Sequence, residues 1–148
     1  MDDVRAFLGE RRYAVLVTHD RDGGIHLTPI WFLFEEDRFY FPSSSHSRKA
    51  KNVERHASAS VVVEARQPGL DNWVSASGSV LVLRGDEAQV VNARIRRRYL
   101  TRQPLGGPIE ADLAASDDVT LTLTPAAWRS WSAPHEKSPE RCFLPLKP

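Results

Sequence analysis

The sequence has little of several things that define whole classes of protein. It contains one cysteine, Cys142, in 148 residues. An internal disulfide framework is therefore excluded, and the lone thiol predicts a reducing compartment, which we expect to be the cytoplasm. No apolar run approaches the roughly 20 residues that cross a bilayer, so we expect no membrane partner. The acidic start, Met1-Asp2-Asp3-Val4, does not predict a signal peptide.

The chain also has almost no net charge. The chain has 20 lysines and arginines against 19 aspartates and glutamates, which gives a formal net charge of +1. No global field attracts nucleic acid, so any cationic site must be local. The densest run, Arg94-Ile95-Arg96-Arg97-Arg98, could contact nucleic acid or an acidic ligand tail. It shares a predicted helix with an apolar stripe, so we expect a solvated helix face and no nucleic-acid partner.

The usual signatures of catalysis are missing as well. There is no Gly-x-Ser-x-Gly, P-loop or dinucleotide-binding glycine motif, so catalytic residues stay unassigned. We expect no metal site, because no metal-ligand spacing relates Cys142 to any of the five histidines: His19, His26, His46, His56 and His135. Such a chain can still be an enzyme if a bound cofactor carries the chemistry.

The chain does contain a β-rich pattern that we assign to one domain, residues 1–148. Three strands joined by tight turns open it and are expected to pair as a meander: Tyr13–Thr18, Ile25–Phe34 and Phe39–Phe41. Later strands are expected at Ala59–Glu64, at Trp73–Leu83 with a bulge at Gly78, at Val119–Leu123 and at Ala127–Trp131. Six or seven mostly antiparallel strands in this order favour a closed or nearly closed barrel.

Two or three short helices are expected between these strands. One begins at Asp2 or Asp3, and another spans Arg48–Arg55 with Ser47 as its N-cap. A third runs from Asp86 to about Leu100 and is followed by a loop through Pro108.

The segment Ser43–Asn52 is the best candidate for a binding site. It leaves a strand, crosses a hydroxyl-rich loop and enters a helix, whose first N–H groups are free and carry partial positive charge. Arg48, Lys49 and Lys51 add cations, and together these groups suit a phosphate monoester. A serine loop followed by a solvated basic helix is the alternative.

Two further features could contact a ligand. Pro29, within Thr28-Pro29-Ile30-Trp31-Phe32, has no backbone N–H to donate to a neighbouring strand. Its place in a strand therefore predicts a bulge or an edge where a planar ring could bind. Trp31 and Phe32 could equally be core residues. The tryptophans Trp73, Trp128 and Trp131 could stack on a ring or bury a dimer interface, although core packing is the commoner use.

The order of these parts resembles the pyridoxamine-phosphate-oxidase-like split barrels, the flavin/deazaflavin oxidoreductase superfamily. Ala14–Thr18 with Thr28–Phe32 is similar to the opening hairpin of the family, and Ser47, Lys49 and Asn52 match its S-x-K-x-x-N segment. Asn72–Gly78 resembles its next long strand, and Leu121–Pro125 followed by Trp128 and Trp131 resembles its closing strand. The resemblance covers almost the whole chain and implies a β-rich (α+β) split β-barrel.

The resemblance also implies a homodimer that holds two molecules of F420 or FMN at its interface. The segment implied to hold the cofactor phosphate contributes Ser45, Ser47, Arg48, Lys49, Lys51 and Asn52. The ring would face the backbone of Pro29, Ile30, Trp31 and Phe32, and Trp73 and Trp131 would approach from the partner chain. Some relatives bind haem instead. If this chain did so, His19, His26 or His135 could be the axial ligand.

The chain also departs from true pyridoxamine-phosphate oxidases. Their R-x-V-L-L-K strand is replaced here by Thr28–Leu33, and their C-terminal Arg/His set is not evident in Ser138–Pro148. The resemblance therefore implies an oxidoreductase that transfers hydride between F420 or FMN and a small organic substrate, not a vitamin B6 oxidase. A non-catalytic protein that binds flavin, deazaflavin or haem is the alternative.

Overall fold

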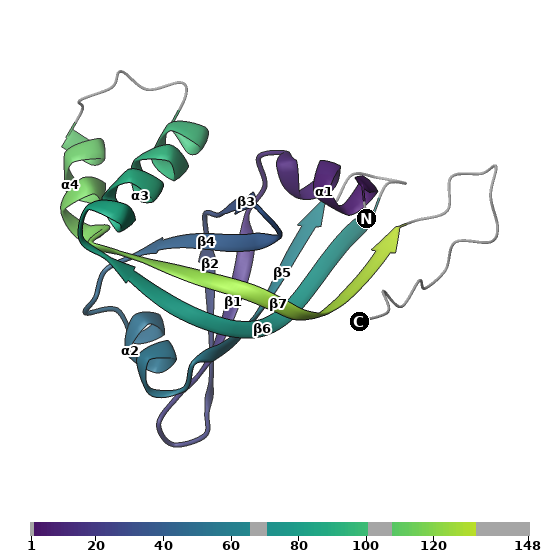
Figure 1. Cartoon of the computed structure of the whole chain (residues 1–148), viewed down its shortest axis with the longest axis horizontal. Helices are drawn as coiled ribbons and strands as arrows, with labels where there is room; N and C mark the ends of the chain where they lie inside the picture. The colour runs from purple at the N-terminus through teal and green to yellow at the C-terminus, as the bar shows by residue number, and fades with distance from the viewer. Residues whose placement is uncertain (1, 66–70, 101–107, 133–148) are drawn as a thin grey trace.

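The structure, a computed structural model of the chain, describes residues 2–65, 71–100 and 108–132. Its centre is one curled sheet (Figure 1). The seven strands are β1 (Ala14–His19), β2 (Ile25–Ile30), β3 (Leu33–Glu35), β4 (Arg38–Ser43), β5 (Ser58–Ala65), β6 (Asn72–Arg84) and β7 (Val119–Ser132). All neighbours pair antiparallel in the order β2-β1-β5-β6-β7-β4-β3, which confirms the predicted strand number and direction. The strands predicted separately at Val119–Leu123 and Ala127–Trp131 form the single strand β7.

The sheet is not closed, and the predicted opening meander is wrong. Strands β2 and β3 follow each other in the chain but form opposite edges of the sheet. The alternation of buried and exposed residues fails at this point, because Phe32 and Leu33 are both buried. A single strand through residues 25–34 cannot bury two neighbouring side chains on one face, so the chain leaves one edge and joins the other. Pro29 lies on an edge strand, as its missing donor predicts.

Four helices lie in the described residues: α1 (Asp2–Gly9), α2 (Arg48–Arg55), α3 (Gly85–Tyr99) and α4 (Pro108–Ser116). Figure 1 places α3 and α4 side by side at one end of the sheet, with α2 below the same end. Two or three helices were expected, and α4 is the additional one. Its start was read as part of a loop, although proline is favoured at the first position of a helix.

Helix α2 has the predicted bounds and the predicted cap. The Ser47 side chain accepts a hydrogen bond from the Ala50 N–H at 3.2 Å. Ala50, Asn52 and Val53 form its buried face. The cap and this inward face fix where the helix begins and which side chains turn outward.

The core consists of side chains from both halves of the sheet, with three phenylalanines, Phe32, Phe39 and Phe41, fully buried. The predicted bulge occurs in β6, where the register with β7 shifts between Ser77 and Gly78. A Cβ at Gly78 would lie 2.0 Å from the Thr124 carbonyl oxygen, so only glycine allows the two strands this approach.

The arginine run on α3 is not the solvated face that was expected. Arg96 is buried and pairs with the Asp117 carboxylate at 3.3 Å. Arg98 donates to the carbonyl oxygens of Leu8 and Glu10, and Arg97 is exposed. Periodicity alone does not reveal that α3 is covered on a second side by Asp117, which lies between α4 and β7.

Candidate functional site

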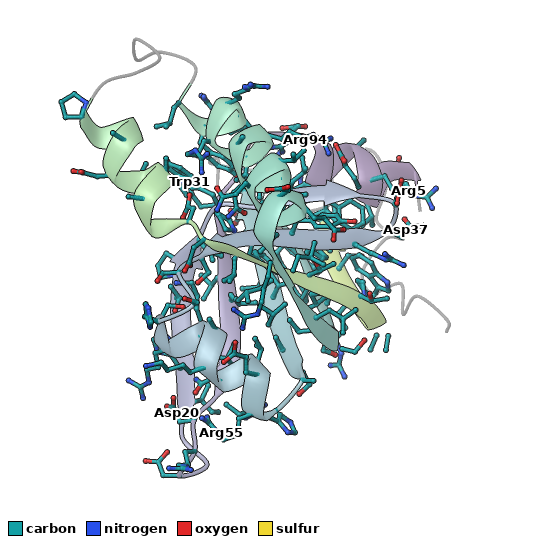
Figure 2. The ribbon with its side chains drawn as sticks, turned by 60° about the vertical axis from the view of Figure 1, so that its left-hand side comes forward. Arg5, Asp20, Trp31, Asp37, Arg55 and Arg94 are labelled. Carbon is teal, nitrogen blue, oxygen red and sulfur yellow. The ribbon has the colours of Figure 1, made fainter. Side chains whose placement is uncertain are left out.

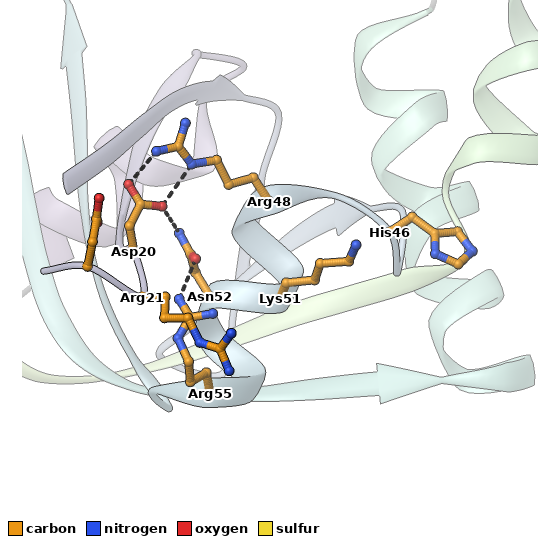
Figure 3. Close-up of a pocket in the computed structure, with 8 residues that line it drawn as sticks. Asp20, Arg21, His46, Arg48, Lys51, Asn52 and Arg55 are labelled. Atoms are coloured by element: carbon orange, nitrogen blue, oxygen red, sulfur yellow. Dashed lines mark hydrogen bonds and ion pairs between the residues drawn. The ribbon is translucent and has the colours of Figure 1, made fainter. Parts of the chain in front are cut away.

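An open groove of about 560 Å³ lies between the β1–β2 turn and α2 (Figure 3). Four basic side chains and two carboxylates of the β1–β2 turn line it, together with a histidine and an asparagine. The lining residues are Asp20, Arg21, Asp22, His46, Arg48, Lys51, Asn52 and Arg55.

Asp20 is the central acceptor of this groove. Arg48 binds its carboxylate with both ends of the guanidinium, Nε to Oδ1 at 2.8 Å and NH2 to Oδ2 at 2.5 Å. Asn52 donates its Nδ2 to the same Oδ1 at 2.9 Å. The hydrogen bonds from Arg48 and then from Asn52 lower the pKa of Asp20 to about 2, so the carboxylate is ionised at neutral pH.

A second layer of hydrogen bonds holds this cluster against the sheet. The buried Asn52 amide also donates to the Thr18 hydroxyl at 3.1 Å. Its oxygen accepts from Arg55 at 2.7 Å, and Arg55 reaches the His19 carbonyl oxygen at 3.1 Å. Of the predicted phosphate ligands, Arg48, Lys51 and Asn52 thus lie together, and the Asn52 side chain orients its neighbours from below.

The serine loop before α2 is ordered by its own side chains. The Ser43 and Ser47 hydroxyls lie 2.7 Å apart, and the Ser47 N–H donates to the Ser44 carbonyl oxygen at 3.0 Å. Ser45 donates its N–H to Asp118 Oδ1 at 2.5 Å and its hydroxyl to Asp118 Oδ2 at 2.7 Å. The loop therefore already binds one anionic group, a carboxylate of the chain itself.

Lys49 does not line the groove with Arg48 and Lys51. It is half-buried, and burial lowers its pKa, which the nearby Asp117 carboxylate raises in part. Burial likewise raises the pKa of Asp117, opposed by its bond to Arg96. Figure 3 shows Arg48 turned toward Asp20 and Lys51 extended toward His46. Of the three predicted cations, Arg48 and Lys51 therefore share the groove, and Lys49 lies outside it.

The segment predicted to face a cofactor ring forms a corner held by Tyr99. Ile30 and Phe32 are buried, and the Trp31 ring stacks on Tyr99 with centroids 5.0 Å apart and planes 5° apart. The Phe32 N–H donates to the Tyr99 hydroxyl at 3.2 Å. That hydroxyl also contacts the carbonyl oxygens of Arg12 and Phe32.

Pro29 is exposed and lines a second depression of about 370 Å³ on the β1–β2–β5 face, which it shares with Arg11, Arg12, Tyr13, Ala14, Val15, Val62 and Glu64. This depression and the groove beside α2 have no lining residue in common. Within the described chain, the two parts of the predicted cofactor site therefore form separate surfaces.

Trp73 and Trp131 form a neighbouring pair across β6 and β7. Trp73 also pairs with Glu64 of β5, whereas α2 joins the opposite end of β5 near Ser58. Six residues of strand separate these ends by roughly 20 Å. One chain therefore does not bring these tryptophans to the serine loop, and their predicted role in a partner's site is untested.

Sequence reasoning missed Asp20, Arg55, Tyr99 and the pair Asp117-Asp118. Asp20 lies in the turn between β1 and β2, and Tyr99 ends α3, so the local sequence around each predicts only a turn or a helix. No local pattern links Asp20 or Asp118 to the serine loop or to α2, because they reach these elements through contacts between segments distant in the sequence.

The histidines form no metal centre in the described part of the chain, where no group of three potential ligands gathers. His26 bonds the Thr28 hydroxyl at 2.8 Å, and the His19 and His56 rings meet edge to face at 5.5 Å. His135 and Cys142 lie outside the described residues. Among the described helices, none is both long and apolar enough to span a membrane.

Comparison with known proteins places this geometry in a family. A solved conserved hypothetical protein of Mycobacterium tuberculosis, Rv2991, is 22% identical with a TM-score of 0.76, over 95% of this chain and 92% of that chain. A structure named F420 reductase is 22% identical with a TM-score of 0.68, over 84% of this chain and 94% of its own.

HutZ, the haem storage protein of Vibrio cholerae, is 19% identical with a TM-score of 0.65, over 88% of this chain and 92% of that one. No curated protein matches the sequence. These likenesses confirm the split-barrel fold. The family model described as pyridoxamine 5′-phosphate oxidase matches residues 1–132. The chain therefore belongs to the pyridoxamine 5′-phosphate oxidase-like family of split barrels.

Proposed function

We propose that this protein is an oxidoreductase that transfers hydride between F420, or FMN, and a small organic substrate. The observation that carries the proposal is the start of α2 in a chain of this family. A hydroxyl-rich loop, a capped helix N-terminus and three cations within four positions meet there. This set of donors suits a phosphate group of a flavin or deazaflavin.

The residues fit such a cofactor in number and kind. Ser45, Ser47 and the first N–H groups of α2 would bind the phosphate oxygens, with Arg48, Lys49 and Lys51 supplying positive charge. Asn52 would hold the segment in place through Thr18 and Asp20. When bound, the cofactor supplies the hydride chemistry, which explains why the chain needs no evident nucleophile of its own.

The second half of the proposed site needs a second copy of the chain. Pro29 to Phe32 would face the ring, and Trp73 and Trp131 would come from the partner in a homodimer. The separation of these elements from α2 within one chain supports an assembly in which two subunits complete each site. A cytoplasmic, dimeric enzyme is the form we expect.

Vitamin B6 oxidation is not the activity that we propose, even though it gives the family its name. The corresponding segment here reads Thr28-Pro29-Ile30-Trp31-Phe32-Leu33 and carries neither of the cations of R-x-V-L-L-K. The likeness to the structure named F420 reductase supports the deazaflavin. The likeness to HutZ supports a second candidate, a non-catalytic haem-binding protein.

Titration separates these functions. The purified protein is mixed with F420, FMN and haem in turn, and binding is followed by absorbance and fluorescence. Tight binding of F420 or FMN, followed by oxidation of the reduced cofactor when small organic acceptors are added, supports the oxidoreductase. A Soret band with haem and no affinity for F420 or FMN would overturn it.

A further inference from the structure

Asp118 occupies donors that a phosphate at this site would use. Its two carboxylate oxygens accept from the Ser45 N–H at 2.5 Å and from the Ser45 hydroxyl at 2.7 Å. The Asp118 side chain is exposed, so it reaches the loop from the solvent side. The Ser45 hydroxyl bond is the main cause that holds the pKa of Asp118 below its usual range, and the carboxylate is therefore ionised at neutral pH.

The positive charge at the start of α2 is balanced only in part within the chain. Arg48 is bound at both ends by Asp20, and Lys49 lies near Asp117, which also pairs with the buried Arg96. Arg21 and Arg55 add positive charge beside Arg48 and Lys51 in the groove. The segment therefore keeps charge for an anionic ligand, and Asp118 is the carboxylate that lies directly on its loop donors.

We infer that Asp118 is a specificity residue that makes this site favour a phosphate bearing one negative charge, a phosphodiester, over a phosphate monoester. The inference rests on the proposed function and narrows its cofactor class. A monoester carries about 1.5–2 negative charges at pH 7 and a diester carries one. The phosphate of F420 is a diester and that of FMN is a monoester, so the geometry favours F420.

The size of the effect follows from Coulomb's law. Two charges roughly 6 Å apart in a largely solvated site change affinity about 3- to 10-fold per unit of ligand charge. The monoester would feel the Asp118 charge up to twice as strongly as the diester, whereas the phosphate-free ring would not feel it. Asp118 would thus alter the ratio of two affinities while leaving the binding of the ring unchanged.

The test compares ligands that differ only in the phosphate. Each ring, flavin and deazaflavin, is offered as its 5′-phosphate, as the methyl ester of that phosphate and as the phosphate-free alcohol. Dissociation constants are measured for the wild type and for Asp118→Asn, whose amide can still bond both Ser45 groups. Asp37→Asn is the matched control, because Asp37 is an exposed carboxylate paired with Arg5 and lies far from Asp20 (Figure 2).

Because the two phosphates differ by about 0.5 to 1 charge, we expect Asp118→Asn to strengthen monoester binding about 2- to 10-fold relative to diester binding, with no change in Asp37→Asn. An unchanged ratio in Asp118→Asn would overturn the inference and leave the proposed function standing. An equal loss for all three forms of a ring would also overturn it, because Asp118 would then only hold the loop. If the wild type bound neither ring in any form, the proposed function would fail along with the inference.

Discussion

Two basic runs of similar composition, Arg48–Lys51 on α2 and Arg94–Arg98 on α3, have opposite relations to the fold. The first opens its helix, and its Arg48 and Lys51 line a groove that is open to solvent. The second closes its helix, where Arg96 is buried on Asp117 and Arg98 donates to the carbonyl oxygens of Leu8 and Glu10 at the end of α1. Cations at a helix C-terminus also balance its dipole, whereas cations at the N-terminus oppose it.

The position of a basic run within its helix thus decides its role more than its charge does. Cations at a helix N-terminus cost stability and need a carboxylate or a bound anion nearby, as Asp20 provides for Arg48. Cations at a C-terminus interact favourably with the helix dipole and can pair with acceptors inside the fold, as Arg96 and Arg98 do. The run on α2 is therefore the one that has a ligand-binding role in this account, and the run on α3 has a structural one.

The largest expected effect comes from the buried pair on α3. Arg96→Gln would leave the Asp117 carboxylate buried without its cation and should lower the free energy of unfolding by about 2–4 kcal/mol. Urea unfolding followed by circular dichroism measures this. Arg97→Gln, on the exposed neighbour, should change the same quantity by no more than about 0.5 kcal/mol. Equal effects of the two substitutions would show that the two arginines do not differ as described.

A smaller loss is expected at the last residue of α3. Tyr99→Phe keeps the ring on Trp31 but removes the hydroxyl that bonds the Phe32 backbone, so unfolding should become easier by about 1–2 kcal/mol. Tyr13→Phe, which alters an exposed ring, is the control. Trp31 fluorescence should stay close to that of the wild type in both. A stability loss in Tyr13→Phe as large as in Tyr99→Phe would contradict this account.

The smallest effect concerns acid stability on the α2 side. Because the folded pKa of Asp20 is about 2, below the usual 3.8, its ionised form stabilises the fold above about pH 4. That stabilisation is lost as the pH falls from about 4 toward 2. Asp20→Asn should therefore melt below the wild type at pH 5–7, and the gap should close toward pH 2. A gap that is constant with pH would mean that the Asp20 charge contributes nothing.

Local patterns predicted the elements that local chemistry controls. The Ser47 cap and the basic sequence after it predicted the bounds of α2, and Gly78 predicted the bulge in β6. The sheet order could not be predicted in the same way, because strands Ile25–Ile30 and Leu33–Glu35 are separated only by Trp31 and Phe32 and still join opposite edges. That choice depends on which partner strands, distant in sequence, are free to pair.

The site was predictable only where its residues are contiguous. Arg48, Lys51 and Asn52 share one groove because residues three and four positions apart lie on the same face of a helix. Asp20 and Asp118 enter through tertiary contacts across 28 and 73 residues, so no spacing rule could reveal them. The half-buried place of Lys49 near Asp117 could not be predicted for the same reason, since it depends on where the chain enters β7.

The central claim, that the start of α2 binds the phosphate of a flavin or deazaflavin, is tested most directly at Lys49. Lys49→Met removes the charge and keeps a long apolar side chain in a half-buried position. The dissociation constants of FMN and F420 and of their phosphate-free rings are measured for this variant, with Arg97→Gln as control. We predict about 10- to 150-fold weaker binding of the phosphorylated cofactors, unchanged affinity for the bare rings and a nearly unchanged melting temperature. Intact affinity for FMN and F420, or an equal loss for the bare rings, would contradict the account.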